Sequence, residues 1–222
     1  MNDRDARGAT RAVLFDLDGT LADTAADLGA AVNRLRAARG LPGLSPGEVR
    51  AYASSGARGL LRVGLGMSPA DPDYESVRDA FLAHYAARVC VETRLFPGIA
   101  ELLAALAARG IKWGIVTNKV ARFTEPIVAA LGVSPDCVVS GDTTPHAKPH
   151  PAPLLHAAEG LGLAPRECCY LGDDLRDVQA AHAAGMRAIA VEYGYHGIDN
   201  GGPSNWNADA IIAQPIDLIA HL

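Results

Sequence analysis

The stretch AVLFDLDGTLADT spans residues 12–24 and runs from an apolar segment directly into two aspartates. The apolar residues 12–15 read as a short buried strand. Asp16 and Asp18 follow two positions apart, so an extended backbone points both side chains the same way. Like carboxylates placed side by side repel, and one of them takes up a proton unless a cation lies between them. The pair therefore predicts a bound cation at the end of the first strand.

Five more short apolar runs read as buried strands, at residues 112–117, 137–140, 169–172, 188–191 and 210–212. Helical patterns lie between the later runs, at residues 98–110, 122–132, 151–162 and 177–185, and each ends in glycine, as helix C-termini often do. Strands that alternate with helices of ~10–15 residues indicate βαβ units. The predicted fold class is α/β, with a Rossmann-like three-layer core built on a parallel sheet.

One segment breaks this alternation. Residues 24–93 contain only helical patterns, such as DLGAAVNRLRAARG at 27–40 and DPDYESVRDAFLAHYAARV at 71–89. We interpret residues 24–93 as a helical cap domain inserted after the first strand. The α/β core then comprises residues 11–23 and 94–222, and residues 1–10 form a disordered lead-in.

The composition excludes several classes of function. Of the 222 residues 49% are hydrophobic, and the formal net charge of -5 argues against nucleic acid as a partner. No apolar stretch reaches the ~20 residues that span a bilayer, and the polar N-terminus lacks the apolar core of a signal peptide. The four cysteines show no C-x-x-C spacing, which favours reduced thiols. We expect a cytoplasmic monomer or homodimer that acts on a small molecule, without membrane or nucleic-acid partners.

Polar residues follow four of the predicted strands. They are Asp16 and Asp18 after the first, Thr117 and Asn118 after the second, Lys148 in the loop after the third, and Asp173, Asp174 and Asp177 after the fourth. The carboxyl ends of parallel strands meet at one edge of a sheet, where ligand sites gather. Clustered carboxylates suit Mg²⁺, and a lysine and a hydroxyl can hold phosphate oxygens. A carboxylate can also act as nucleophile and form an aspartyl-phosphate, so the set predicts phosphoryl transfer.

The motifs DLDGT (16–20), TNK (117–119), KP (148–149) and GDDLRD (172–177) resemble, in this order, the four motifs of the haloacid dehalogenase superfamily. The resemblance implies that Asp16 is the nucleophile, and that Asp18 is first the general acid and then the base. It also implies a Mg²⁺ cofactor bound by Asp16, Asp173 and the backbone carbonyl of Asp18, with Asp177 orienting the metal shell through water. The phosphoryl group would be held by Thr117, Asn118 and Lys119 and neutralised by Lys148. Many relatives carry Ser or Thr in place of Asp174, whose role stays open.

The helical cap and the stretches at 54–66 and 95–119 resemble phosphoglycolate phosphatases within this superfamily. The tail YGYHGIDNGGPSNWNAD (193–209) is similar to a bacterial branch that includes N-acetylmuramic acid 6-phosphate phosphatases, and it either lines the substrate entrance or forms a surface loop pinned by Trp206. Arg58 of the cap is the candidate for binding a substrate carboxylate. The resemblance implies a Mg²⁺-dependent phosphatase acting on a small phosphate monoester through an aspartyl-phosphate. Phosphoglycolate is the first substrate expected, and the amino-sugar phosphate is the alternative.

Other interpretations fit the motifs less well. A phosphomutase would share the aspartyl-phosphate and differ in whether a sugar or water attacks it. A receiver-type phospho-acceptor takes its acid pair and its phosphorylated aspartate from different strands and has no cap, whereas DLDGT carries both acids together. Carbon–halogen cleavage would leave Asp18 without a role. His146 and His150 flank Lys148, but histidine matches Mg²⁺ poorly, so we interpret them as loop residues.

Overall fold

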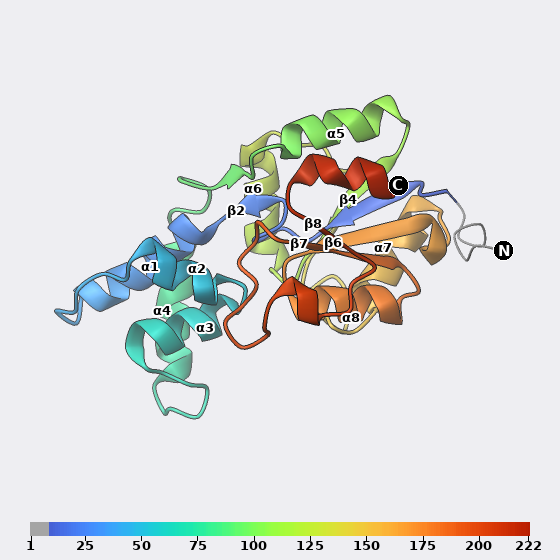
Figure 1. The fold of residues 1–222 in the computed structure, drawn as a ribbon. Helices are drawn as coiled ribbons and strands as arrows, with labels where there is room; N and C mark the ends of the chain where they lie inside the picture. The colour runs from blue at the N-terminus through green and yellow to red at the C-terminus, as the bar shows by residue number, and fades with distance from the viewer. Residues whose placement is uncertain (1–8) are drawn as a thin grey trace.

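The computed structural model describes residues 9–222, so most of the expected lead-in lies outside the described residues. Six strands form one sheet in the order β5-β4-β1-β6-β7-β8, and every neighbouring pair is parallel (Figure 1). The strands are β1 (Ala12–Phe15), β4 (Lys112–Val116), β5 (Cys137–Val139), β6 (Cys168–Gly172), β7 (Arg187–Val191) and β8 (Ala210–Ile212). They match the six apolar runs of the sequence, and the predicted α/β fold class is confirmed.

Helices cover both faces of this sheet. The bounds are α5 (Ile99–Ala108), α6 (Ala121–Leu131), α7 (Ala152–Leu161) and α8 (Leu175–Ala183), with 3₁₀ segments η1 (Pro165–Glu167), η2 (Pro203–Asn205) and η3 (Pro215–His221). Val13 and Phe15 of β1 share a buried apolar cluster with side chains of α5, α6 and η3. Ala12 and Leu14 share a second cluster with α7 and α8. The alternation along one strand therefore produces the three layers, because successive side chains point to opposite faces.

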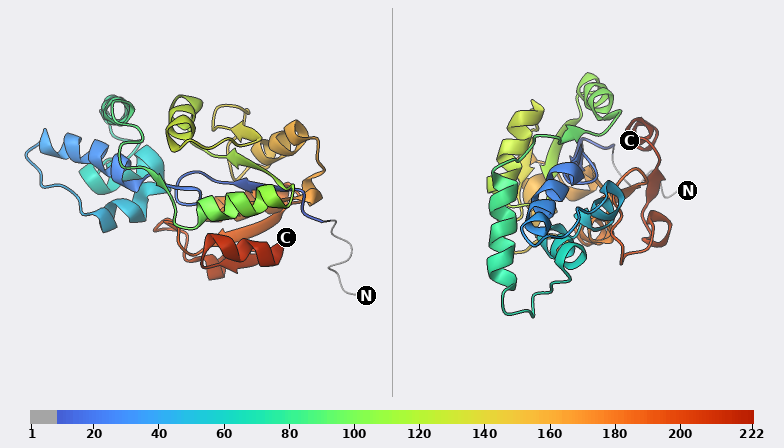
Figure 2. Two further views of the ribbon diagram at one scale, coloured as in Figure 1. Left: turned by 90° about the horizontal axis from the view of Figure 1, so that it is seen from above. Right: turned by 90° about the vertical axis from the view of Figure 1, so that its left-hand side faces the viewer.

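Four further helices form a body beyond one end of the sheet (Figure 2). They are α1 (Ala25–Ala37), α2 (Pro46–Ala53), α3 (Gly56–Leu65) and α4 (Tyr74–Ala86). The short strands β2 (Ala22–Asp23) and β3 (Arg94–Leu95) pair antiparallel where the chain enters and leaves this body. We propose that these helices form the cap domain, with boundaries near residues 24 and 93. No helix within residues 9–222 is long and apolar enough to cross a membrane.

The sequence of the cap explains where its second helix begins. Ser45 precedes α2, and its hydroxyl accepts a hydrogen bond from the backbone of Glu48, whose carboxylate in turn accepts from the Ser45 backbone at 2.8 Å. This reciprocal pair is a capping box, and Pro46 fits the first helical position because it lacks only a hydrogen-bond donor that the helix end does not use. The start of α2 therefore depends on local residues.

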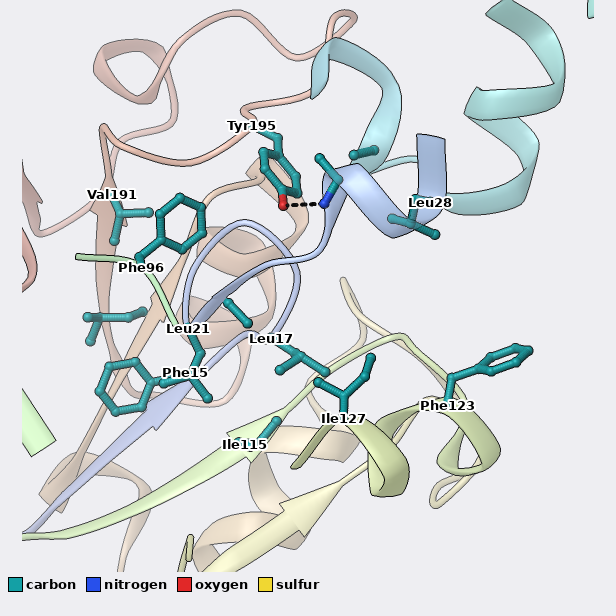
Figure 3. Packing of buried hydrophobic residues seen from close by; sticks show 14 of the residues in the cluster. Phe15, Leu17, Leu21, Leu28, Phe96, Ile115, Phe123, Ile127, Val191 and Tyr195 are labelled. Carbon is teal, nitrogen blue, oxygen red and sulfur yellow. Dashed lines mark hydrogen bonds between the residues drawn. The ribbon is translucent and has the colours of Figure 1, made fainter. Parts of the chain in front are cut away.

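The buried apolar cluster on one face of the sheet continues into the cap (Figure 3). Leu17 and Leu21 are fully buried in the loop that follows β1, and Leu28 of α1 belongs to the same cluster. Phe96, on the returning segment, lies 5.1 Å from the ring centre of Tyr193. The loop that carries Asp16 and Asp18 is thus held by apolar packing on both sides, which fixes the two carboxylates in place.

Candidate active site

A cavity of about 450 Å³ opens where β1, β4 and β6 end, and the cap covers it. Its lining includes seven residues of the predicted set: Asp16, Asp18, Thr117, Asn118, Lys119, Lys148 and Asp177. The backbone places them. The amide of Asp16 donates to the Leu171 carbonyl at 2.9 Å, and the amide of Thr117 donates to the Val139 carbonyl at 2.9 Å. These bonds extend the hydrogen bonding of the sheet by one residue. The side chains of Asp16 and Thr117 therefore project from backbone that the sheet holds in place.

Lys148 is buried among hydrogen-bond acceptors. Its Nζ lies 2.8 Å from Oδ1 of Asp16, 2.8 Å from Oδ1 of Asp177 and 2.6 Å from the hydroxyl of Tyr170. That hydroxyl donates in turn to the Val116 carbonyl at 2.7 Å. Burial by itself lowers the pKa of Lys148, but the two carboxylates outweigh burial and hold the pKa above its ordinary value. The ammonium is therefore a permanent positive charge beside Asp16.

Three carboxylates converge next to this lysine. One oxygen from each of Asp16, Asp173 and Asp177 lies within 4.8 Å of the others. Burial, together with the charges of the other two, raises the pKa of Asp173 well above its usual range, and burial also raises that of Asp177. A single lysine cannot neutralise three such groups, whereas a hard divalent cation with oxygen ligands does. The donor set fits Mg²⁺.

Asp173 is held by contacts from three segments. It accepts hydrogen bonds from the backbone amide of Tyr195 at 2.8 Å, the hydroxyl of Thr20 at 3.3 Å and the hydroxyl of Ser54 at 3.3 Å. Gly19 lies against the same carboxylate with a φ of +87°, and a Cβ there would collide with it. The turn of the first motif must therefore be glycine, because any side chain would displace the carboxylate of Asp173.

Asp18 lies outside the three-carboxylate set and has its own partners. The hydroxyl of Thr24 donates to its Oδ1, and Nζ of Lys119 lies 3.1 Å from its Oδ2. The attraction of Asp18 outweighs burial and raises the pKa of Lys119. Asp18 was expected to meet the metal through its backbone carbonyl, and that expectation stays a prediction. Lys119 was expected to bind the phosphoryl group, which also stays a prediction, although its ammonium contacts Asp18 here.

Asn118 positions the loop that carries Lys148. Its side-chain amide donates to the Lys148 carbonyl at 2.9 Å, and its side-chain oxygen accepts from the Lys148 backbone amide at 2.9 Å. Thr117 stays beside the cavity, and its hydroxyl accepts a hydrogen bond from the Lys119 amide at 3.2 Å. Both residues line the cavity that Asp16 also lines. Their contact with a phosphoryl group bound there stays a prediction.

Asp174 belongs to a network that joins the cap, the core and the tail. It begins α8 and accepts hydrogen bonds from the backbone amide of Arg176 at 2.9 Å and from the side chain of Asn200 at 2.9 Å. The Arg176 guanidinium reaches the Ser54 carbonyl of the cap at 2.7 Å. Trp206 is buried and donates to the Asn200 carbonyl at 2.7 Å, so it pins the 193–209 loop. In the described part of the chain this loop does not line the cavity.

The arginines differ from the sequence-based expectation. Arg58 is exposed on α3 and is not among the residues that line the cavity, so its contact with substrate stays a prediction. Arg78, Arg122 and Arg176 line the cavity instead. One signal was present for the first of these, since residues 78, 81 and 85 share one face of a helix and combine an arginine with two aromatic side chains.

The fold is a three-layer α/β core with a carboxylate–lysine site at the edge of its sheet, and comparisons with known proteins identify the family. Residues 10–185 match the model of the haloacid dehalogenase-like hydrolases, and the chain belongs to that family. It is 44% identical over 212 residues to the N-acetylmuramic acid 6-phosphate phosphatase of Pseudomonas aeruginosa, which covers 94% of this chain and 93% of that protein.

Two further relatives are similar along nearly their whole length. The chain is 42% identical over 210 residues to a phosphoglycolate phosphatase of Xanthomonas campestris pv. campestris, covering 94% of each protein. The crystal structure of a predicted phosphoglycolate phosphatase from Haemophilus somnus superposes with a TM-score of 0.83 at 28% identity and covers 96% of this chain and 97% of that one. The expected superfamily, and the likeness to phosphoglycolate phosphatases within it, are confirmed.

Proposed function

We propose that this chain is a Mg²⁺-dependent phosphatase that hydrolyses a small phosphate monoester through an aspartyl-phosphate on Asp16. One observation carries the proposal: Lys148 holds Oδ1 of Asp16 at 2.8 Å inside a cavity that also contains Asp18. The proposed nucleophile, Asp16, and the proposed proton-transfer group, Asp18, are two residues apart and line the same cavity. The names of the similar phosphatases support the same reaction class.

The residues supply both halves of the reaction. A carboxylate oxygen of Asp16 attacks phosphorus, and the ester P–O bond breaks as Asp18 gives its proton to the leaving oxygen. Water then attacks the phosphorus of the aspartyl-phosphate, Asp18 takes the proton of that water, and phosphate leaves with Asp16 restored. Lys148 stabilises negative charge on the transferring group throughout.

The metal would be held by the carboxylates of Asp16, Asp173 and Asp177 and the backbone carbonyl of Asp18. When bound, Mg²⁺ neutralises charge on the phosphate oxygens. Thr117, Asn118 and Lys119 would hold the remaining oxygens of the phosphoryl group. Arg58 is the sequence-based candidate for a substrate carboxylate.

Phosphoglycolate is the first candidate substrate, because the cap, the motifs and the names of several similar proteins favour it. N-acetylmuramic acid 6-phosphate is the second candidate, and two observations favour it. A cavity of about 450 Å³ is more than a two-carbon acid fills. The relative from Pseudomonas aeruginosa that is 44% identical is named an N-acetylmuramic acid 6-phosphate phosphatase.

We place the protein in the cytoplasm as a monomer or homodimer. The four cysteines, Cys90, Cys137, Cys168 and Cys169, are all free thiols. Burial raises the pKa of Cys168 to about 11 and that of Cys169 to about 12, so these thiols stay protonated at neutral pH. Free thiols are typical of a reducing compartment.

A substrate panel tests the proposed function. Purified protein with Mg²⁺ is assayed for phosphate release from p-nitrophenyl phosphate, phosphoglycolate and N-acetylmuramic acid 6-phosphate, with and without excess chelator. We expect hydrolysis of the generic ester, faster hydrolysis of one natural ester, and loss of all activity with chelator. Full activity in chelator would contradict the metal assignment.

A further inference from the structure

We propose that one face of α4 forms the subsite for the leaving group, in which Tyr85 bonds an oxygen of that group and Arg78 binds a carboxylate at its far end. This inference rests on the proposed phosphatase function and names a substrate class for it, namely an acidic phosphate ester longer than a two-carbon acid. It therefore ranks the amino-sugar phosphate ahead of phosphoglycolate. The face consists of residues 78, 81, 82 and 85, which line the cavity from the cap side.

The spacing of these residues makes one continuous surface. Positions three, four and seven apart lie on the same side of a helix, so Arg78, Phe81, Leu82 and Tyr85 form a stripe two turns long. Asp16, Asp18 and Lys148 line the same cavity from the core. A substrate whose phosphoryl group meets the core residues therefore extends its leaving group along α4.

Tyr85 has a buried hydroxyl whose proton no described residue accepts. The residue is 2% exposed, and the cation that acts on its hydroxyl is the ammonium of Lys119, which can donate to the oxygen but cannot accept its proton. The ring lies 4.8 Å from Nζ of Lys119, which contacts Asp18 at 3.1 Å. Burial raises the pKa of Tyr85 to about 12, so the hydroxyl carries its proton at neutral pH and can donate. A buried hydroxyl whose proton has no acceptor is unfavourable unless a ligand supplies that acceptor. The leaving group would lie near Asp18, and Lys119 contacts both Asp18 and the Tyr85 ring.

Arg78 supplies the cation at the other end of the stripe. Its Nε is buried and makes no hydrogen bond within residues 9–222. Its Nη1 lies 2.7 Å from a carboxylate oxygen of Glu75, a side chain that is 68% exposed. Its Nη2 lies 3.4 Å from Oδ1 of Asp79, a side chain that is 70% exposed. Exposed pairs of this kind contribute little, so a substrate carboxylate can replace Glu75 and Asp79 on the guanidinium. A planar guanidinium binds a carboxylate with two parallel hydrogen bonds.

The length of the stripe selects among acidic esters. Arg78 and Tyr85 are seven positions apart on α4, which corresponds to about 10 Å along the helix axis. Phosphoglycolate has only two carbons between its phosphate oxygen and the end of its carboxylate, so it cannot reach from the core residues to Arg78. An N-acetylmuramic acid 6-phosphate carries its lactyl carboxylate across the sugar ring from the phosphate and suits this spacing.

The test uses two sugar phosphates that differ only in the acid. N-acetylglucosamine 6-phosphate lacks the lactyl group of N-acetylmuramic acid 6-phosphate, and p-nitrophenyl phosphate reports the core reaction alone. We expect Arg78→Gln to lower kcat/KM for the muramic ester about 10- to 100-fold, mainly through KM, as loss of a charged hydrogen bond does. The other two esters should be hydrolysed as before. Arg88→Ala, at an exposed arginine just beyond α4, is the matched control and should change none of them.

Tyr85→Phe gives an independent readout. It should lower kcat/KM for both sugar phosphates about 5- to 30-fold, without lowering the melting temperature, because no described residue accepts a hydrogen bond from the lost hydroxyl. A fall in melting temperature would show a structural role and overturn the subsite.

Equal effects of Arg78→Gln on all three esters, or no preference of the wild-type for the muramic ester over its acid-free partner, would also overturn the subsite while leaving the phosphatase function intact. Failure of the wild-type with Mg²⁺ to hydrolyse p-nitrophenyl phosphate would overturn the proposed function itself, and the subsite with it.

Discussion

Tyr195 connects a proposed metal ligand, Asp173, to the hinge of the cap. Its backbone amide donates to Oδ2 of Asp173 at 2.8 Å. At the other end of the side chain, the hydroxyl donates to the carboxylate of Asp23 at 2.7 Å and accepts from the amide of Ala25 at 3.0 Å, the contact drawn in Figure 3. It also accepts from the amide of Thr24 at 2.7 Å. One residue thus fixes both the carboxylate and the point where α1 leaves the core.

Replacing Tyr195 by phenylalanine tests this connection. The ring and the backbone bond to Asp173 remain, but two buried amides at the start of α1 lose their acceptor. We expect the free energy of unfolding to fall by about 1–3 kcal/mol, measured in urea, and kcat/KM to fall with it. Tyr193→Phe is the control, because the Tyr193 hydroxyl makes one hydrogen bond, to the Thr20 carbonyl at 3.2 Å. Equal stability of the two variants would contradict a special role for Tyr195.

Lys148→Ala should lower both activity and stability. The substitution leaves the buried carboxylates of Asp16 and Asp177 without their shared cation, and removing one partner from a buried ion pair costs about 3–5 kcal/mol. Loss of one preorganised charge at the transferring group adds roughly 2.7–4 kcal/mol to the barrier. Thermal unfolding and kcat/KM measure the two effects. Lys112→Ala, at an exposed lysine whose ammonium donates to the Leu161 carbonyl at 3.1 Å, is the control for activity and should leave kcat/KM unchanged. An unchanged kcat/KM in Lys148→Ala would place Lys148 outside the site.

Mg²⁺ should stabilise the protein in the absence of substrate. Three carboxylates lie within 4.8 Å, and a cation that binds only the folded state adds about 2.7 kcal/mol at a concentration 100 times its Kd. For a chain of this length that corresponds to a rise in melting temperature of roughly 5–10 °C. Differential scanning fluorimetry across a Mg²⁺ series measures it. Asp173→Asn should remove most of the increase. A melting temperature of the wild-type protein that does not change with Mg²⁺ concentration would contradict the proposed metal site.

Comparing Gly19→Ala with Gly40→Ala separates the effect of the contact with Asp173 from the effect of a positive φ. Gly19 and Gly40 both have positive φ, +87° and +68°, but a Cβ on Gly40 meets nothing within 4 Å whereas one on Gly19 collides with Asp173. Alanine at either position carries the cost of a left-handed conformation, about 1–2 kcal/mol. We expect Gly19→Ala to be the more destabilising in urea and to lose the thermal response to Mg²⁺. Equal losses in the two variants would show that the contact with Asp173 is unimportant.

The sequence predicts the sheet and the chemical groups at its edge because both depend on local pattern. Each of the six strands is a short apolar run, and most motif residues follow a strand or stand at the start of a helix, whereas Lys148 lies in the loop before α7. β2 and β3 were not predicted, since two residues each carry no periodicity and their pairing joins segments that lie on either side of residues 24–93 in the sequence.

Contacts between distant segments were also beyond sequence reasoning. Tyr170 looks like one more residue of an apolar strand, yet its hydroxyl meets Lys148 across the sheet edge. The contact of Arg176 with the Ser54 carbonyl joins residues 122 positions apart. The sequence places Arg78 on one helix face with the aromatic residues 81 and 85, but it does not show that this face, rather than Arg58, lines the cavity.

Phosphorylation of Asp16 is the central claim, and rapid quenching of the Asp18→Asn variant measures it directly. p-Nitrophenolate leaves without being protonated, so this variant should still form the aspartyl-phosphate. It should hydrolyse that intermediate about 10²- to 10⁴-fold more slowly, because no base at position 18 activates the attacking water. After mixing with Mg²⁺ and p-nitrophenyl phosphate and quenching in acid, peptide mass spectrometry should find one phosphoryl group on Asp16, removable by hydroxylamine and absent from Asp16→Asn. Release of p-nitrophenolate with Asp16 unmodified at every time, or with the phosphoryl group on another residue, would contradict the mechanism.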